Sequence, residues 1–419
     1  MITGWRCAVC GASVDIAQPF TWRCAHSSEA DRHHAPQLVQ TIEPLRSSGE
    51  SNPFLGFRRY LAVDTFMERA GITDERRAAL IGDLGQGFVT TPFERADALS
   101  DELGFTTDGG VWVKDETHNV GGSHKARHLF PILVHLLAAE ESGLAAWSGR
   151  PPLAIASCGN AAIAAATLAA KVSWPLHVFV PQWASASVTT TLRGLGAQLI
   201  ECPRRAADPP GDPCVHRFRE AVAAGAIPFS VQGTENAWCL DGGRTIGWEM
   251  ARHMEERIDG SPFDRLFVQV GGGAFAACVA AGFRMSGISP KLHAVQTEAC
   301  APLARAWERA QSLGGPKSAA EHWVECMWPW ESVGSTAADG ILDDETYDWL
   351  PVLAAMADSK GSPVVVAESF VARANEVGCR ATGIDASHTG TAGLAGLLAI
   401  RDQVQSDERV AVIFSGVRR

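Results

Sequence analysis

The sequence of 419 residues lacks a long apolar run and lacks an excess of basic residues. No apolar stretch reaches the length of about 18 residues that a membrane-spanning helix needs, which argues against a membrane protein. The formal net charge of −11 at pH 7 argues against nucleic acid or an anionic membrane as the main partner. The first residues, Met1 to Arg6, do not have the pattern of a secretory signal peptide.

The cysteines do not form the pattern of a disulfide framework. Their number, 11, is odd, and Cys158, Cys278 and Cys300 stand within apolar stretches. Reduced thiols fit this distribution better than the paired cysteines of a secreted domain. We therefore expect a cytoplasmic protein.

The N-terminal stretch 1–45 is predicted to be a separate Cys-rich ribbon followed by a linker. It begins with a CxxCG knuckle, and a Cys-x-His pair follows a short segment that contains tryptophan. Two such pairs supply the nitrogen and sulfur ligands of a tetrahedral zinc site. The predicted ligands of a structural zinc ion are Cys7, Cys10, Cys24 and His26, and His33 or His34 could replace His26. Free thiols without a metal are the alternative.

The rest of the chain alternates between strand-like and helical patterns. This alternation predicts an α/β fold with parallel sheets covered on both faces, and the number of strands indicates two sheets. A chain of this length is also too long for one ordinary core. We expect a large domain formed by 46–145 plus 245–419, a small α/β domain over 146–244, and an irregular, Trp-rich loop over Glu321–Ala338. The predicted strands are Val111–Lys114, Leu153–Ala156, Leu176–Val180, Gln198–Ile200, Pro228–Val231, Leu266–Val270, Lys291–Val295, Val364–Val366 and Val410–Phe414.

One lysine stands where a strand gives way to a helix. Gly121 and Gly122 break the chain after the first predicted strand, Ser123 can cap a helix, and an amphipathic run starts near His124. Lys125 is therefore expected in the first helical turn, where free N–H groups and the helix dipole disfavour an ammonium and lower its pKa. A lysine with a lowered pKa suits Schiff-base chemistry. The plain alternative is a solvated helix residue.

Three other strand ends carry small or polar residues, at the edge where open α/β sheets bind ligands. The turn Ser157–Ala162 offers a hydroxyl, an amide and several N–H groups, which suit a carboxylate. Gly271–Ala274 follows a buried strand and can approach a phosphate closely, although it is neither a dinucleotide fingerprint nor a Walker loop. Ser415 follows the last strand. Each of these could alternatively be an ordinary turn.

A loop that can bind phosphate and a lysine with a lowered pKa, both at strand ends of an α/β fold, indicate that the cofactor is pyridoxal phosphate. From about Asn52 to its end, the chain resembles the fold-type II pyridoxal-phosphate enzymes, the family of tryptophan synthase β, threonine synthase and serine/threonine dehydratase. The motifs that carry the resemblance are Thr91–Phe93, Lys114–Glu116, Gly122–Arg127, Ser157–Ala162, Asp241–Thr245, Gly271–Ala274 and Val295–Glu298. The N-terminal cysteine knuckle is similar to ribbons on some threonine synthases.

The resemblance implies a role for each of the four junctions, and it implies a homodimer. Lys125 would form the Schiff base and move the Cα proton, Asn160 would bond the cofactor O3′, and Ser415 would face the pyridine nitrogen. The phosphate would be held by Gly271, Gly272, Gly273 and Ala274, and the substrate carboxylate by Ser157, Gly159, Asn160 and Ala161.

A serine at the pyridine nitrogen, unlike an aspartate, does not favour a protonated ring, and an unprotonated ring is the weaker electron sink. β-Elimination or β-replacement therefore suits this site better than transamination. We expect a lyase that deaminates a small hydroxy-amino acid such as L-threonine or L-serine. A threonine synthase, a β-replacement synthase and a catalytically silent binding protein remain alternatives. His124, where the family usually has Phe, would either protonate the leaving group or pack as a neutral residue.

Overall fold

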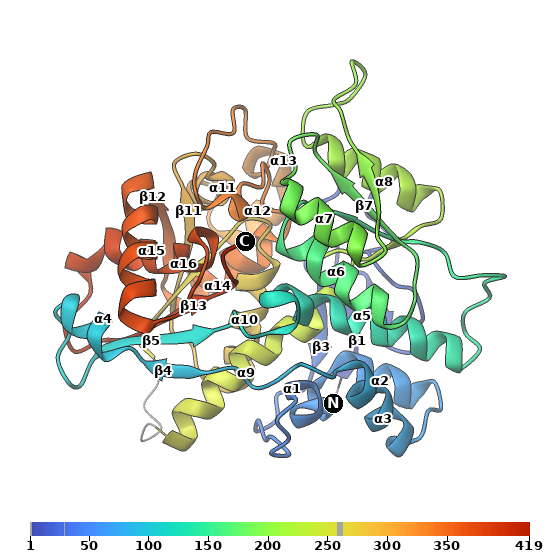
Figure 1. Ribbon diagram of the computed structural model, residues 1–419, viewed down its shortest axis with the longest axis horizontal. Helices are drawn as coiled ribbons and strands as arrows, with labels where there is room; N and C mark the ends of the chain where they lie inside the picture. Colours follow the sequence, from blue (N-terminus) through green and yellow to red (C-terminus); the bar gives the residue numbers. More distant parts are fainter. Residues whose placement is uncertain (1, 29, 258–262) are drawn as a thin grey trace.

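Two parallel sheets, each covered by helices, make up most of the structure (Figure 1). The computed structural model describes residues 2–28, 30–257 and 263–419. In Figure 1 the six-stranded sheet lies on the left, the four-stranded sheet lies on the right, and the N-terminal ribbon lies below. This arrangement confirms the α/β fold with two parallel sheets that the alternating pattern predicts.

The larger sheet has the strand order β12-β11-β10-β13-β5-β4. All neighbouring pairs are parallel except β4 and β5. Side chains alternate between its two faces: Trp112 packs with α9 and α10, whereas Val111 and Val113 pack with α15 and α16. Its strands are β4 (Phe93–Arg95), β5 (Gly110–Asp115), β10 (Arg265–Gln269), β11 (Lys291–Thr297), β12 (Ser362–Val366) and β13 (Arg409–Phe414).

Helices cover both faces of this larger sheet. One face carries α9 (Cys239–Arg257), α10 (Ala274–Met285), α11 (Pro302–Ser312), α12 (Pro316–Glu321), α13 (Trp323–Cys326) and α14 (Trp349–Ser359). The other face carries α4 (Asp97–Glu102), α15 (Glu368–Thr382) and α16 (His388–Ala399).

The smaller sheet has the order β8-β7-β6-β9, and all of its pairs are parallel. The Ala-rich helix α6 packs closely because its side chains are short, and most of them are buried. The strands are β6 (Leu153–Ala156), β7 (Leu176–Val180), β8 (Gln198–Glu201) and β9 (Ile227–Pro228), and the helices around them are α5 (Lys125–Glu141), α6 (Asn160–Lys171), α7 (Ala186–Gly194) and α8 (Pro213–Ala223). All of these strands fall inside the stretch 146–244, while the domain boundaries themselves stay a prediction.

The N-terminal ribbon is a three-stranded antiparallel sheet of β1 (Ile2–Cys7), β2 (Ser13–Asp15) and β3 (Pro36–Gln40). β3 lies in the residues expected to be a polar linker, and it pairs with β1. The edge of the Trp5 ring meets Trp238 at 5.6 Å between centroids, so the ribbon packs on the α9 side of the protein. The helices α1 (Pro53–Gly56), α2 (Ala62–Arg69) and α3 (Asp74–Leu84) follow.

Three local predictions differ from the structure. The predicted strand Pro228–Val231 is only the short β9, which is shifted to Ile227–Pro228. β4 is not among the predicted strands, and it forms because the chain leaves the Pro92 turn extended and pairs with β5. The Trp-rich stretch is not wholly irregular, since α13 lies within it.

Helices α9 and α10 approach each other through two glycines. A Cβ atom on Gly282 would lie 2.6 Å from the carbonyl oxygen of Arg244 and 3.1 Å from the Cα of Gly247. No side chain fits between the helices at this point. The contact therefore sets the position of α10, the helix that follows the glycine loop.

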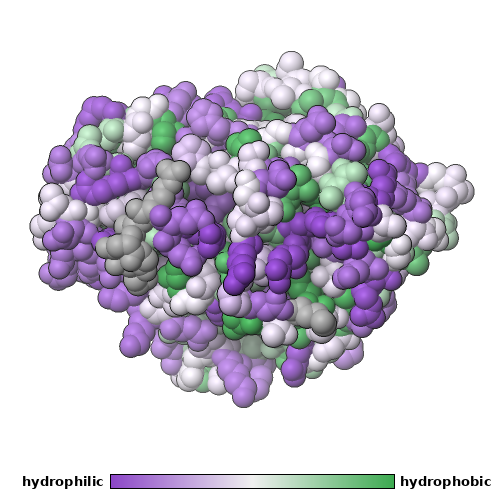
Figure 2. All heavy atoms as spheres, turned by 90° about the horizontal axis from the view of Figure 1, so that it is seen from below, coloured by the Kyte–Doolittle hydropathy of each residue, from purple (hydrophilic) through white to green (hydrophobic). Residues whose placement is uncertain are grey.

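The surface is mostly polar on the face shown in Figure 2, where apolar residues form small groups between polar ones. Large exposed apolar side chains are separated along the chain, and Trp183, which is 76% exposed, is the most exposed of those in the described ranges. None of the helices in residues 2–28, 30–257 and 263–419 combines the length and apolar character needed to cross a membrane.

His135 of α5 is buried beside the ribbon, and its surroundings favour the neutral imidazole. Its Nε2 accepts the N–H of Phe20 at 3.2 Å, and its ring lies 3.9 Å from that of Trp238. Burial lowers the pKa of His135 from 6.5 to about 3. The unfolded chain therefore binds an extra proton between these two pH values.

We predict that the substitution His135→Phe removes part of the acid sensitivity of the fold. The contribution of His135 to stability is complete above pH 6.5 and falls by about 1.4 kcal/mol per pH unit as the pH drops toward 3. The difference in unfolding free energy between wild type and variant, measured in urea from pH 7.5 to 4.5, should shrink by this slope as the pH falls. A difference that does not depend on pH would contradict the prediction.

Candidate active site

The four junctions singled out in the sequence meet in space. The backbone N–H of His124 donates to the carbonyl oxygen of Ser415 at 3.0 Å, and Ser123 forms a β-bridge with Gly416. The end of β13 therefore lies against the start of α5. Gly416 is also so close to Asn160 that an added Cβ would lie 2.8 Å from the Asn160 Nδ2. This contact places the start of α6 at the same point.

The glycine loop joins this group through aromatic packing. The His124 ring stacks on Phe275, in the first turn of α10, with 4.0 Å between centroids. Lys125 opens α5 as predicted, although its N-cap is His124 rather than Ser123. The Ser123 hydroxyl still accepts the N–H of Lys125, at 3.4 Å.

Lys125 is half-buried and chemically perturbed. Desolvation lowers the pKa of Lys125, while the carboxylate of Asp343 and the thiol of Cys239 act in the opposite direction. Asp343 lies on residues 339–348, which we call the acidic loop because Asp339, Asp343, Asp344, Glu345 and Asp348 belong to it. The net lowering of the pKa favours the neutral amine that nucleophilic and base chemistry requires.

The glycine loop is shaped to bind an anion. Gly273, the N-cap of α10, has a φ of 95°, and no side chain caps the helix. The N–H of Gly272 bonds the Asp343 carboxyl, and a Cβ on Gly271 would overlap the same carboxyl. Burial raises the pKa of Asp343 to about 6. The start of α10 has no side-chain cap and the Gly272 N–H already meets a carboxyl oxygen, so these backbone groups fit the phosphate of pyridoxal phosphate.

The turn after β6 is open to a ligand. Residues 156–160 are half-exposed, in contrast to the buried strand before them, and Ser157 Oγ accepts the N–H of Gly159 at 3.3 Å. Asn160 Oδ1 accepts a hydrogen bond from Arg419 Nε at 2.6 Å, which leaves its amide N–H groups to donate. Ala161 is buried in the first turn of α6.

The acidic loop faces this turn. Burial raises the pKa of the Cys158 thiol to about 11, and the carboxylates of Asp339, Asp212 and Asp343 add to the effect. The acidic loop therefore lies near the open turn after β6, as does the Arg419 guanidinium.

The Ser415 hydroxyl has one hydrogen-bond partner in the described part of the chain. It is buried, and its Oγ accepts a hydrogen bond from Gln269 Nε2 at 2.6 Å. Gln269 Nε2 also donates to the carbonyl oxygen of Gly390 at 2.9 Å, which fixes the amide as the donor. The hydroxyl proton of Ser415 is therefore available to an acceptor in the site.

His124 is a neutral packing residue. Burial, together with the positive charge of Lys125, brings its pKa well below 6.5, and its Nδ1 lies 3.1 Å from the carbonyl oxygen of Ser415. His128, one turn later, behaves in the same way, and burial lowers its pKa to about 3. The structure thus supports packing rather than proton donation for His124.

A buried ion network lies behind the site and uses several residues of the sequence motifs. Arg127 donates to both oxygens of Glu116 at 2.9 Å and also pairs with Glu249. Lys114 pairs with Glu249 and donates to the Thr91 carbonyl oxygen at 2.7 Å. Burial lowers the pKa of Lys114, and Arg127 and Lys114 together hold the pKa of Glu249 below its usual value despite its burial.

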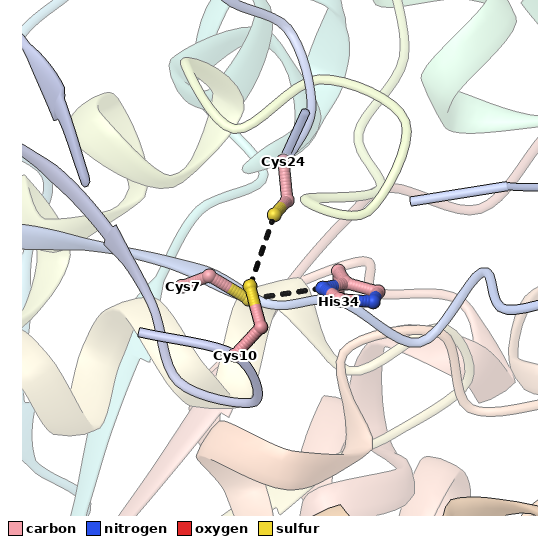
Figure 3. Close-up of side chains that lie close together, drawn as sticks. All are labelled: Cys7, Cys10, Cys24 and His34. Atoms are coloured by element: carbon pink, nitrogen blue, oxygen red, sulfur yellow. Dashed lines mark hydrogen bonds between the residues drawn. The ribbon is translucent and has the colours of Figure 1, made fainter. Parts of the chain in front are cut away.

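The N-terminal cysteines gather with a different histidine from the predicted one. Ligand atoms of Cys7, Cys10, Cys24 and His34 all lie within 4.8 Å of one another (Figure 3). His26 is exposed and is not part of this group. The reason is the pairing of β1 with β3, in which Cys7 lies opposite Pro36 and so brings His34 to the knuckle.

Sequence reasoning missed four residues of the site: Asp343, Gln269, Cys239 and Arg419. Gln269 had a signal, because it is a polar residue in a buried apolar strand. The others reach the site through loop conformation or long-range packing and match no motif.

Two parallel sheets, with the lysine-bearing start of α5 packed through His124 against Phe275 beside the glycine loop, are the arrangement of the fold-type II class of pyridoxal-phosphate enzymes. A family model described as "Pyridoxal-phosphate dependent enzyme" matches residues 84–416, so the chain belongs to that family. No curated protein matches the chain.

Several solved structures share the fold. A threonine deaminase from T.th. has a TM-score of 0.64 at 19% identity and covers 83% of this chain and 98% of its own. A fungal L-serine ammonia-lyase from Rhizomucor miehei has a TM-score of 0.60 at 18% identity, with coverages of 79% and 94%. Diaminopropionate ammonia lyase from Escherichia coli has a TM-score of 0.61 at 18% identity, with coverages of 81% and 88%.

We predict that Arg127→Met destabilises the fold by about 3–5 kcal/mol, because it leaves buried carboxylates without their cation. Unfolding in urea measures the loss. The matched control is Arg76→Met, which removes an exposed ion pair with Glu141 and should change stability far less. Equal losses in the two variants would show that the network does not stabilise the fold.

We predict that Gly273→Ala weakens pyridoxal-phosphate binding by about tenfold or more. Its Cβ would lie 3.0 Å from Thr346 Cγ2 and 3.2 Å from the Asp348 carbonyl carbon, which deforms the glycine loop. Gly314→Ala is the control, since Gly314 has nearly the same φ, 96°, but only Ser318 Oγ lies near, at 3.9 Å. Both variants should lose stability from the left-handed backbone, and cofactor titration should separate them. Equal affinities of the two variants for pyridoxal phosphate would show that the glycine loop does not hold the phosphate.

Proposed function

We propose that this protein is a pyridoxal-phosphate-dependent lyase that removes the β-hydroxyl group of a small hydroxy-amino acid, L-threonine or L-serine. The observation that carries the proposal is the hydrogen bond from Gln269 to Ser415 Oγ, at 2.6 Å. Because Ser415 accepts this bond, its own proton is free to donate to a ring nitrogen that carries no proton.

The cofactor, when bound, withdraws electrons from the substrate Cα and so makes its proton removable. A ring without a proton on its nitrogen withdraws electrons less strongly. Prompt loss of a β-substituent suits such a site better than transamination, which needs a longer-lived carbanion. The hydroxyl of Ser415 therefore supports β-elimination over transamination.

The residues of this chain that would hold the cofactor are Lys125, Asn160, Gly271, Gly272, Gly273, Ala274 and Ser415. The glycine-loop amides would hold the phosphate, and the N–H groups of the Asn160 side chain would bond O3′. The turn Ser157–Ala161, of which residues 157–160 are half-exposed, would orient the substrate carboxylate.

Lys125 would move the Cα proton. The lowered pKa of Lys125 favours a neutral amine that accepts this proton. The C–O bond to the β-hydroxyl then breaks with its electron pair on the oxygen, and this oxygen takes up the proton that Lys125 removed and leaves as water. The enamine that is released tautomerises to an imine, and water hydrolyses the imine to a 2-oxo acid and ammonia.

The solved structures that share the fold include a threonine deaminase and an L-serine ammonia-lyase, and also racemases and a synthase. At identities of 16–19% they support the fold alone, so the choice of reaction rests on the site. The homodimer and the cytoplasmic location stay predictions.

We predict that Lys125→Ala loses both the visible absorbance band of the lysine-attached cofactor and all turnover. Lys171→Ala is the control, because that side chain only bonds backbone oxygens of Leu84 and Gln86 at the surface. Spectra of the two purified variants check this prediction. A normal band and full turnover in Lys125→Ala would refute the assignment.

Substrate identity is tested on the wild type. L-Threonine, L-serine and O-phospho-L-homoserine are added separately, and ammonia and 2-oxo acid are assayed. Oxo acid from threonine or serine supports the lyase, whereas a response to the phosphorylated substrate alone indicates a threonine synthase. Capture of the product by an added thiol or indole indicates a β-replacement synthase. Failure to bind the cofactor would favour a silent binding protein.

A further inference from the structure

The three cysteines and His34 come from three separate segments of the ribbon. Cys7 ends β1, Cys10 lies in the turn that follows, Cys24 lies in the next loop, and His34 stands just before β3. Figure 3 shows their side chains converging on one point. None of them takes part in the candidate active site.

Their spacing suits a metal better than a disulfide. Cys7 Sγ lies 3.3 Å from His34 Nδ1, and Cys10 Sγ lies 3.5 Å from Cys24 Sγ. A tetrahedral zinc ion, with bonds of about 2.3 Å to sulfur and about 2.0 Å to nitrogen, separates its ligand atoms by about 3.5–3.8 Å. A disulfide would need about 2.05 Å between sulfurs. Three thiols and one imidazole are a ligand set that zinc favours.

The surroundings of His34 support metal binding. Asp31 Oδ2 lies 3.1 Å from His34 Nε2, so the carboxylate holds the Nε2 proton and leaves the Nδ1 lone pair toward the cysteines. Cys7, Cys24 and His34 are buried, whereas Cys10 is exposed and gives the ion a path of entry.

The ribbon is tied to the acidic loop next to this cluster. Arg32 Nη2 donates to Glu345 Oε1 at 2.8 Å, and Trp349 Nε1 donates to His33 Nδ1 at 3.2 Å. Both ribbon residues directly precede His34. Three residues after Glu345, the N–H of Asp348 donates to the carbonyl oxygen of Gly272 at 2.8 Å. A continuous set of contacts thus leads from the cluster to the glycine loop.

We propose that Cys7, Cys10, Cys24 and His34 bind one zinc ion, and that this ion holds Arg32 and His33 in place against the acidic loop. The ribbon is a small sheet with few buried apolar residues of its own, and units of this size usually need a metal or a disulfide to stay ordered. By fixing these two residues, the zinc ion would also order the acidic loop, which lies against the glycine loop. The proposal does not depend on the reaction.

The metal content of the protein tests the first half of the proposal, the zinc site. The purified full chain should contain about one zinc per chain by mass spectrometry, and cobalt in its place should give the visible spectrum of tetrahedral thiolate ligation. Cys10→Ser and His34→Ala should lose the metal, whereas the controls Cys379→Ser and His26→Ala should keep it. Asp31→Asn should weaken zinc binding about tenfold. A chain that binds neither metal with its thiols free, or that forms a Cys10–Cys24 disulfide, overturns the zinc site.

Hydrogen exchange tests the second half of the proposal, the link between the zinc site and the acidic loop, and it needs no cofactor. Peptides from residues 339–348 should exchange at least about tenfold faster in the zinc-free protein than in the zinc-bound one. Arg32→Ala, which keeps the ligands, should have the same effect with zinc bound, and Arg76→Ala should not. Circular dichroism confirms that each variant is folded. Unchanged exchange in both the zinc-free protein and Arg32→Ala overturns the link to the acidic loop.

Discussion

Charge balance inside the protein fixes the position of Lys125. Lys114 of β5 and Arg127 of α5 meet two carboxylates, Glu116 and Glu249, in a place with no access to water. Taken together the four groups are neutral, and none of them can move away without leaving a buried charge unpaired. Lys125 stands two residues before Arg127, so the network sets where its amine lies. The charged motif residues around Lys125 therefore position it and take no direct part in the proposed chemistry.

Burial has opposite effects on the two charged groups that face each other in the site. It lowers the pKa of Lys125 and raises that of Asp343 to about 6, so both groups move toward their neutral forms. The same dehydrated surroundings thus favour the uncharged form both of an amine and of a carboxyl.

The larger elements of the fold could be predicted from the sequence, because buried parallel strands are short apolar runs followed by small residues. The predicted strands Leu153–Ala156 and Leu176–Val180 coincide with β6 and β7, and the four junctions lie together as their shared position at strand ends implies. β3 could not be predicted, since its sequence is polar and its pairing depends on β1. The same pairing replaces His26 by His34. Asp343 could not be predicted as a site residue, because the conformation of a long loop places it in the site.

The contact between Gly247 and Gly282 limits which sequences this fold can accept. The two helices already touch through their backbones, so any side chain at the crossing can only push them apart. Such a change would shift the glycine loop relative to Glu249 and the rest of the ion network. Loops around the site can therefore vary and alter which ligand is accepted, while the two residues at the crossing, which carry no side chain, have no acceptable replacement. For an engineer who redesigns this site, the crossing of α9 and α10 is the part to leave untouched.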